Sequence, residues 1–217
     1  MPKTAHANWL KPPGPVARGL KIGLLGGSFN PAHEGHLHVS EVSLKRLQLD
    51  YVWWLVAPQN PLKPACGMAP LPDRLAHAVG KYQHHPRIAV VDVETALSTR
   101  FTIDTLNALK HRFPEVHFVW LMGTDNLEQF DRWWRWSEIV AQGPIAVVMR
   151  PGSTLAPLRA KVLQRFADAR VNNPAKLAYA KPPAIAVLDG PRNSASATAI
   201  RAQNFADDAL VRAIPPC

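Results

Sequence analysis

The stretch from Gly23 to Ser40, GLLGGSFNPAHEGHLHVS, places histidines directly after glycines at a spacing that suits a ligand site. His33 and His36 are three residues apart, so at the start of a helix they share one face and can converge on one ligand. Imidazole can ligate a metal, exchange a proton or hold a phosphate. Gly26 and Gly27 precede the pair, and glycine allows a sharp turn and a close approach of the backbone to a ligand.

The alternatives to a phosphate site differ in what else they require of the sequence. A histidine zinc site needs at least one more ligand, and neither Cys66 nor Cys217 lies in a pairing motif. The glycine spacing does not give the G-x-G-x-x-G pattern of dinucleotide-binding folds. A tight turn without a ligand would explain one histidine, but not H-x-G-H preceded by G-G and N-P. We expect a helix that starts near residues 33–35 and directs its N–H groups and dipole at an anion.

The composition fits one globular domain in a reducing compartment. The chain has 217 residues, of which 47% are hydrophobic and 19% charged, and it has two cysteines, too few for a disulfide framework. We therefore predict a cytoplasmic protein. No apolar run approaches the roughly 20 residues that span a membrane, and the start shows no signal peptide. Residues 1–19, rich in proline and glycine, are predicted to be a flexible leader, and 20–217 the folded domain.

The net charge of +9 predicts an anionic partner. Nucleic acid and a phosphorylated metabolite are both compatible with it, because the basic residues are scattered and form no long run. The charge alone does not choose between these two classes.

Apolar runs alternate with helix-like patterns along the chain, which indicates β-α-β units. The predicted strands are 20–26, 51–57, 87–93, 116–122, 144–149 and 184–189. The predicted helices are 35–48, 72–83, 102–112, 126–140, 155–168 and about 196–205, and the segments 57–72 and 172–184 are predicted loops. The strands are nearly continuously apolar, as in strands covered on both faces. We predict an α/β fold: a Rossmann-like, doubly wound, mainly parallel sheet with helices on both faces, in a single domain.

Polar, glycine-containing segments follow the predicted strands, where an open parallel sheet binds its ligands. These segments are 26–30, 58–60, 123–125, 150–152 and 190–201. The chemistry is therefore expected at the carboxyl edge of the sheet.

The segment GGSFNPAHEGHL resembles the G-G-[TS]-F-[DN]-P-x-H-x-G-H signature of the nucleotidyltransferase superfamily, whose members join a nucleotide to a phosphate through the α-phosphate of ATP. Further matching pieces are FTIDTL (101–106), FVWLMGTDNL (118–127), Trp133, VVMRPG (147–152) and SATAIR (196–201). Together they make the chain similar to nicotinate-nucleotide adenylyltransferases over about residues 20–205. The resemblance implies adenylyl transfer from ATP to nicotinate mononucleotide, with Mg²⁺ carried by the ATP phosphates and no metal ligand from the protein.

The resemblance assigns roles to individual residues. The implied catalytic residues are His33, His36, Lys63 and Arg201. The implied ATP-binding residues are Gly26, Gly27, Ser28, Phe29, His33, His36, Gly123, Asp125, Ser196, Thr198 and Arg201. The implied mononucleotide-binding residues are Ser28, Phe29, Lys63, Thr102, Trp133 and Arg150. His36 is expected to contact the α-phosphate in the transition state, with His33 beside it on the triphosphate.

Several of these residues also have simpler interpretations. The simpler interpretation of Lys63 is a solvated loop lysine, and that of Arg150 is a surface arginine. For Asp125 it is a helix N-cap for residues 126–130. In the motif at 196–201, Ala197 stands where the family often has serine, so one hydroxyl contact is missing.

The tryptophans of residues 126–140 are predicted to lie on a continuous helix. Trp133, Trp136 and Val140 then share one face, and Trp134 and Phe130 another. Core packing is the expectation for Trp136, whereas the resemblance makes Trp133 the ring that stacks on the pyridine.

Rival functions remain open from the sequence. One is an adenylyltransferase for another acceptor, such as nicotinamide mononucleotide or phosphopantetheine. Another is a nucleotide- or nucleic-acid-binding protein without turnover, although the intact H-x-G-H and S-x-T-x-I-R pieces favour an enzyme. The resemblance implies ATP and nicotinate mononucleotide as partners, and neither nucleic acid nor a membrane.

Overall fold

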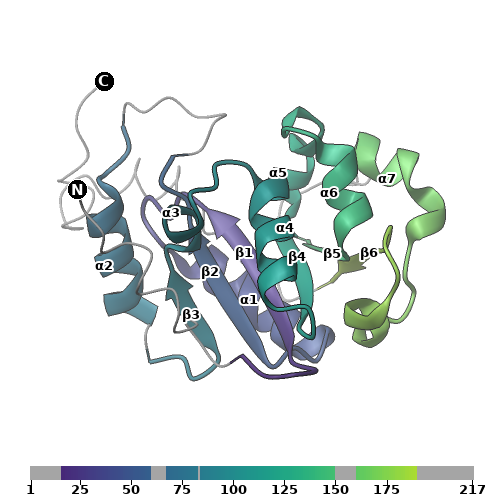
Figure 1. Cartoon of the computed structure of the whole chain (residues 1–217), viewed down its shortest axis with the longest axis horizontal. Coiled ribbons are helices and arrows are strands. Elements are labelled where there is room, and N and C mark those ends of the chain that lie inside the picture. The colour runs from purple at the N-terminus through teal and green to yellow at the C-terminus, as the bar shows by residue number, and fades with distance from the viewer. Residues whose placement is uncertain (1–15, 60–66, 83, 150–159, 190–217) are drawn as a thin grey trace.

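A computed structural model describes residues 16–59, 67–82, 84–149 and 160–189 of the chain (Figure 1). In this part, six parallel strands form one sheet in the order β3-β2-β1-β4-β5-β6. The strands are β1 (Lys21–Gly27), β2 (Tyr51–Val56), β3 (Ile88–Val91), β4 (His117–Gly123), β5 (Ile145–Val148) and β6 (Ile185–Leu188). The helices are α1 (Glu34–Arg46), α2 (Leu71–Tyr82), α3 (Val93–Leu97), α4 (Thr102–Arg112), α5 (Thr124–Leu127), α6 (Trp136–Gln142) and α7 (Lys161–Arg165). Short 3-10 helices are η2 (Phe130–Arg132), η4 (Ala167–Ala169) and η5 (Pro174–Tyr179).

Helices cover both faces of the sheet, because alternate residues of each strand point to opposite sides. Trp53 packs with the residues of α3, α4 and α6, whereas its neighbour Trp54 packs with those of α1 and α2. Both indoles are fully buried. Figure 1 shows α4 in front of the sheet and α1 behind it. The predicted Rossmann-like, doubly wound architecture is confirmed, and each described strand pair is parallel.

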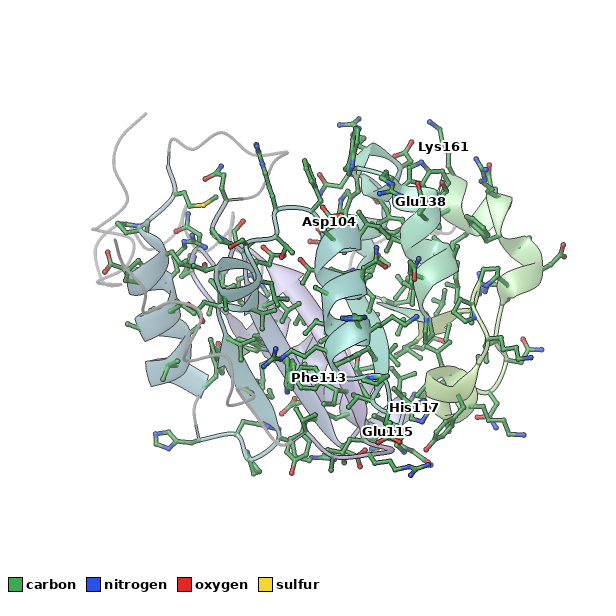
Figure 2. All side chains as sticks on the ribbon, in the orientation of Figure 1. Asp104, Phe113, Glu115, His117, Glu138 and Lys161 are labelled. Carbon is green, nitrogen blue, oxygen red and sulfur yellow. The ribbon has the colours of Figure 1, made fainter. Side chains whose placement is uncertain are left out.

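The winding direction reverses at β1, which pairs with β2 on one side and β4 on the other. Leu25 is in register with Trp54 of β2 and with Leu121 of β4. Open sheets of this order bind ligands at the carboxyl ends of the strands beside such a reversal. Figure 2 marks the two ends of the sheet: His117 begins β4 at the lower end, and Asp104 lies in the first turn of α4 at the upper end.

Four predicted elements differ from the structure. The predicted helix 126–140 is interrupted, since α5 ends at Leu127 and α6 begins only at Trp136. The predicted strand 87–93 stops at Val91, and the chain enters α3 at Val93, which was not predicted. In the described part of the predicted helix 155–168, only 161–165 are α-helical, and the predicted loop 172–184 contains η5.

Two predictions fall wholly or mostly on residues outside the described ranges. These are the leader 1–19, of which only 16–19 are described, and the helix 196–205. The leader, and the single domain that follows it, stay predictions.

Candidate active site

His33 and His36 cap the first turn of α1 reciprocally. His33 is the N-cap residue, and its Nδ1 accepts the Gly35 N–H at 3.0 Å. The His33 N–H in turn donates to Nδ1 of His36 at 3.2 Å, and the two ring centroids are 3.9 Å apart. A neutral imidazole with Nδ1 as acceptor carries its proton on Nε2. The capping box therefore makes Nε2 of both rings an N–H donor, as a phosphate contact requires.

The backbone N–H groups of this turn serve a different purpose from the one predicted. The Gly35 N–H is taken by the His33 ring, and the His36 N–H donates to the His33 carbonyl at 2.8 Å. The expectation that these N–H groups would face the anion is therefore wrong for Gly35 and His36. The imidazole Nε2 atoms are the side-chain groups of this turn that can donate to an anion, and the dipole of the 13-residue helix favours negative charge at this end.

Phe29 makes the sharp turn after β1 and supports the His36 ring. Its φ of 47° is in the left-handed region, which a bulky residue adopts only where its surroundings hold it. The Phe29 ring lies 4.5 Å from the His36 ring and stacks on Trp54 at 5.1 Å. Trp54 Nε1 donates to Ser40 Oγ at 2.8 Å, and that hydroxyl donates to the His36 carbonyl at 2.9 Å. Phe29, Trp54 and Ser40 thus hold the ring and the backbone carbonyl of His36 in place.

The glycines before the turn have another role than the predicted one. Gly26 and Gly27 are the last two residues of β1, and neither has a positive φ. A Cβ on Gly26 would lie 2.6 Å from the ring of Trp120, and one on Gly27 would lie 3.3 Å from the ring of Phe29. The prediction that these glycines form the turn is wrong, because Phe29 does so. Because glycine has no side chain, the ring of Trp120 can pack against Gly26 and the ring of Phe29 against Gly27.

The loop from Ser28 to Pro31 is tied to the segment that precedes α2. Asn30 Nδ2 donates to the Gly67 carbonyl at 2.8 Å, and Asn30 Oδ1 accepts the Ala69 N–H at 3.2 Å. The Ser28 hydroxyl is buried and has no hydrogen-bond partner in the described part of the chain. A buried hydroxyl of this kind is suited to a ligand oxygen, which fits the role that the sequence predicts for Ser28.

Arg74 of α2 is a residue of this region that the sequence reasoning missed. Its guanidinium is buried and donates to four backbone carbonyls, those of Ser28, Ala57, Pro58 and Ala69, at 2.7–2.8 Å. Burial lowers the pKa of Arg74 from its ordinary value. A signal was present, because Arg74 shares one helix face with Ala78 and Tyr82, both buried.

Thr102 is the first residue of α4, which packs on the face of the sheet opposite to α1. The turn that leads to it is held by Thr105, whose Oγ1 lies 2.8 Å from Thr99 Oγ1 and donates to the Phe101 carbonyl at 3.3 Å. Burial raises the pKa of Glu94, in α3, to about 7, although a hydrogen bond from Thr105 acts in the opposite direction. Thr102 is thus presented at the amino end of a helix over a buried polar network.

Trp133 lies just after η2, in extended backbone, and is half-buried. Its ring contacts Phe130 at 5.2 Å and meets Trp120 edge-on at 6.2 Å. Because Trp120 also covers Gly26, one ring links Trp133 to the end of β1. The structure therefore brings the predicted pyridine-stacking residue toward the strand that ends in the histidine turn.

The predicted helical stripe of tryptophans does not form. Trp133 is extended, and Arg135 has a φ of 52°, so Trp133 and Trp136 do not share a continuous helix. Trp136 packs edge-on against Phe166, which confirms its predicted core position. Trp134 is 60% exposed, with its ring 5.7 Å from that of Phe101.

Gly123 and Asp125 lie at the carboxyl end of β4. Gly123 is the N-cap residue of α5, and Asp125 is the second residue of that helix and is exposed. The interpretation of Asp125 as an N-cap is therefore wrong. It lies at the carboxyl end of the strand next to the reversal, and the ribose contact that the sequence predicts for it stays a prediction.

Five of the predicted site residues lie outside the described residues. These are Lys63, Arg150, Ser196, Thr198 and Arg201. Their roles stay predictions.

Comparison with known proteins assigns the family. The model of the cytidylyltransferase-like family matches residues 24–203. Over 185 residues the chain is 55% identical to the "Probable nicotinate-nucleotide adenylyltransferase" of Parvibaculum lavamentivorans, covering 84% of this chain and 92% of the relative. The chain belongs to the nicotinate-nucleotide adenylyltransferase family. A relative of the same name from Cereibacter sphaeroides is 53% identical, covering 84% of the chain and 97% of the relative.

Solved structures of low sequence identity support the same fold for this family member. The Plasmodium falciparum nicotinic acid mononucleotide adenylyltransferase complexed with NaAD aligns with a TM-score of 0.65 at 16% identity, covering 89% of this chain and 88% of that one. Its complex with APC aligns at 0.62 and 17% identity, covering 84% and 83%. At this identity the likeness concerns the fold alone.

The described residues contain no helix that is long and apolar enough to cross a membrane. They also contain no group of three or more histidine, cysteine or acidic residues arranged around a common metal position.

Proposed function

We propose that the chain transfers the adenylyl group of ATP to nicotinate mononucleotide and so forms deamido-NAD and pyrophosphate. The observation that carries the proposal is the reciprocal capping of His33 and His36, in a chain 55% identical to a relative named for this activity. The cap lies after β1, at the reversal of strand order where folds of this kind bind nucleotides. The cytoplasmic location expected from the two cysteines belongs to the same proposal.

The reaction is an in-line displacement at the α-phosphorus of ATP. An oxygen of the mononucleotide phosphate forms the new bond while the bond to the oxygen that bridges the α- and β-phosphorus breaks, and the electron pair leaves with pyrophosphate. The attacking phosphate is already ionised at neutral pH, so the protein need not supply a base. Catalysis then depends on positioning and on stabilising the negative charge that develops.

The histidines are suited to that second task. A donor aimed at the oxygen where charge develops stabilises the transition state more than the ground state. In our proposal His36 Nε2–H donates to the α-phosphate in the transition state, and His33 Nε2–H to the triphosphate beside it. Because both Nδ1 atoms accept backbone N–H groups, the rings act as neutral donors with a fixed tautomer.

The remaining donor-side groups complete the proposed ATP site. Further proposed ATP contacts lie at the ends of β1 and β4. They are the Ser28 hydroxyl, the backbone of Gly26, Gly27 and Phe29, and Asp125 near the ribose. Lys63 and the cluster Ser196, Thr198 and Arg201 are proposed to hold the phosphates. Mg²⁺ enters as part of the substrate Mg-ATP and neutralises phosphate charge there.

The proposed acceptor site lies on the α4 side of the sheet. Trp133 stacks on the pyridine ring, and the Thr102 hydroxyl and the amino end of α4 favour the nicotinate carboxylate. Arg150 is proposed to lie near the same substrate. Stacking alone does not distinguish nicotinate from nicotinamide, so the preference for the acid depends on these donors.

Pyrophosphate release tests the function directly. The protein is incubated with Mg-ATP and nicotinate mononucleotide, nicotinamide mononucleotide or phosphopantetheine in turn, and pyrophosphate and the dinucleotide are measured. We expect release with nicotinate mononucleotide and much less with the other two. A preference for the amide would change the acceptor, and no release with any acceptor would reject the enzymatic function.

A further inference from the structure

Arg74 joins three separate segments beneath the proposed ATP site. Its Nη1 donates to the Ser28 carbonyl at 2.7 Å and to the Ala57 carbonyl at 2.8 Å. Its Nη2 donates to Pro58 and its Nε to Ala69, both at 2.8 Å. One guanidinium thus holds the turn after β1, the end of β2 and the residues before α2.

We propose that Arg74 is a positioning residue that holds the turn after β1 so that Phe29 and His36 keep the geometry required for adenylyl transfer. The inference rests on the proposed function. Arg74 acts through the backbone of Ser28 and is not itself assigned a contact with the substrates.

The path from Arg74 to the histidine is short and made of fixed contacts. The Ser28 carbonyl belongs to the peptide unit that leads into Phe29, where the chain has a φ of 47°. The Phe29 ring lies between Trp54 and His36, at 5.1 and 4.5 Å from their rings. If the Ser28 carbonyl were released, this peptide could rotate and withdraw the ring that supports His36.

The same guanidinium continues the β1–β2 pairing beyond the last residues of the strands. Within the sheet, the Ala57 N–H donates to the Gly27 carbonyl at 2.9 Å. One residue further along each chain, the carbonyls of Ser28 and Pro58 no longer meet a partner strand but point to Arg74. Arg74 therefore holds the ends of β1 and β2 in register at the edge of the proposed ATP site.

The chemistry of the contacts explains why an arginine is required. A guanidinium presents five N–H donors in a rigid plane, whereas a lysine ammonium has three donors on one atom. In the described part of the chain its four acceptors are neutral backbone carbonyls, so the guanidinium brings a buried positive charge beside the proposed phosphate site. Lysine retains that charge without the planar fork, and glutamine retains donors without the charge.

The test compares Arg74→Lys and Arg74→Gln with the full-length wild type. The control is Arg87→Lys, since Arg87 is an exposed arginine just before β3 that donates to the Leu49 carbonyl at the amino ends of the strands, away from the proposed site. Turnover with Mg-ATP and nicotinate mononucleotide is measured at a temperature where thermal unfolding curves show each variant to be folded. Long-range ¹H–¹⁵N spectra of the imidazole rings report on the His33–His36 cap without any need for turnover.

We expect Arg74→Lys to lower kcat about 10- to 100-fold, since small displacements at a reacting centre have effects of this size. The KM of the mononucleotide should change less than about threefold, because Thr102 in α4 and Trp133 after η2 belong to the face of the sheet opposite to the one that α2 covers. The imidazole signals should shift in both Arg74 variants and stay unchanged in Arg87→Lys.

Unchanged kcat and unchanged imidazole signals in a folded Arg74→Lys variant would overturn the inference. Failure of both Arg74 variants to fold would overturn it too, because Arg74 would then be a residue of general stability. A wild type that releases no pyrophosphate would instead reject the proposed function. In that case the imidazole signals still decide whether Arg74 sets the geometry of the turn.

Discussion

The indole of Trp120 occupies the space that a side chain at Gly26 would need. A Cβ at this position would approach the ring to 2.6 Å, and Trp120 is 3% exposed and cannot move aside into solvent. On its far side the same ring meets Trp133 edge-on. The glycine therefore determines how closely an aromatic layer lies against the end of β1.

Gly26→Ala should destabilise the protein by about 1–3 kcal/mol, the usual cost of overpacking a close-packed core. Gly80→Ala is the matched control, because a Cβ there meets nothing within 4 Å and the residue lies inside α2. Alanine is the better helix former, so the control should gain about 0.5–1 kcal/mol. Urea unfolding followed by circular dichroism measures both, and equal effects of the two changes would contradict this account.

His36→Gln should lower kcat about 100- to 1000-fold, because the glutamine amide that caps the helix does not hold its N–H donor where the imidazole Nε2–H lies, and misplacing one transition-state donor typically has an effect of this size. Glutamine at this helix position can restore the reciprocal cap, so the free energy of unfolding should change little. His36→Ala removes both donor and cap, and should lower stability as well as kcat. Near-normal turnover of a folded His36→Gln variant would reject the transition-state role.

Trp133→Leu should raise the KM of the mononucleotide about tenfold or more and leave the KM of ATP nearly unchanged. The reason is that stacking of an aromatic ring on a base contributes about 1–3 kcal/mol. Trp136→Leu is the control, since Trp136 packs against Phe130 and Phe166 and should affect stability alone. Steady-state kinetics with each substrate varied in turn would expose an unchanged acceptor KM, which would remove Trp133 from the site.

Glu94→Gln should change how stability depends on pH. Burial raises the pKa of Glu94 from its ordinary value of 4.5 to about 7, so the native state holds this proton more tightly than the unfolded state does. The wild type should lose up to about 3 kcal/mol as pH rises from about 4.5 to 7. Glutamine can still accept from Thr105 and should abolish that loss, which denaturant unfolding at several pH values would detect.

The exposed Glu128 supplies the control for this measurement, since Glu128→Gln should leave the pH profile as it is in the wild type. If Glu94→Gln retained the wild-type slope, the buried carboxyl would not be its source.

The sheet and the start of α1 could be predicted from the sequence because the signals there are local. Each strand is a short apolar run, and H-x-G-H after a strand predicts a helix that begins at the histidines, although not their reciprocal cap. The interruption of the helix after Leu127 could not be predicted in this way. No glycine or proline marks it, and it follows from tertiary packing: Phe130 is fully buried, and Trp133 rests on Phe130 and Trp120.

Arg74 was missed for a related reason. The spacing of Arg74, Ala78 and Tyr82 indicates its buried helix face, but its acceptors are backbone carbonyls 5, 16, 17 and 46 residues away, which leave no trace in the side-chain pattern. The turn after β1 was assigned to glycines on propensity, but the packing of Phe29 between Trp54 and His36 overrides propensity at that point.

The reversal of strand order at β1 has an evolutionary consequence. The groups proposed to hold ATP on α1 and those proposed to recognise the acceptor on α4 and after η2 pack on opposite faces of the sheet. Substitutions at separate sites that share no partner combine additively in free energy. Changes around Thr102 and Trp133 could therefore retune the choice of acceptor while the donor half keeps its chemistry, so that a new specificity can arise without a new catalytic centre.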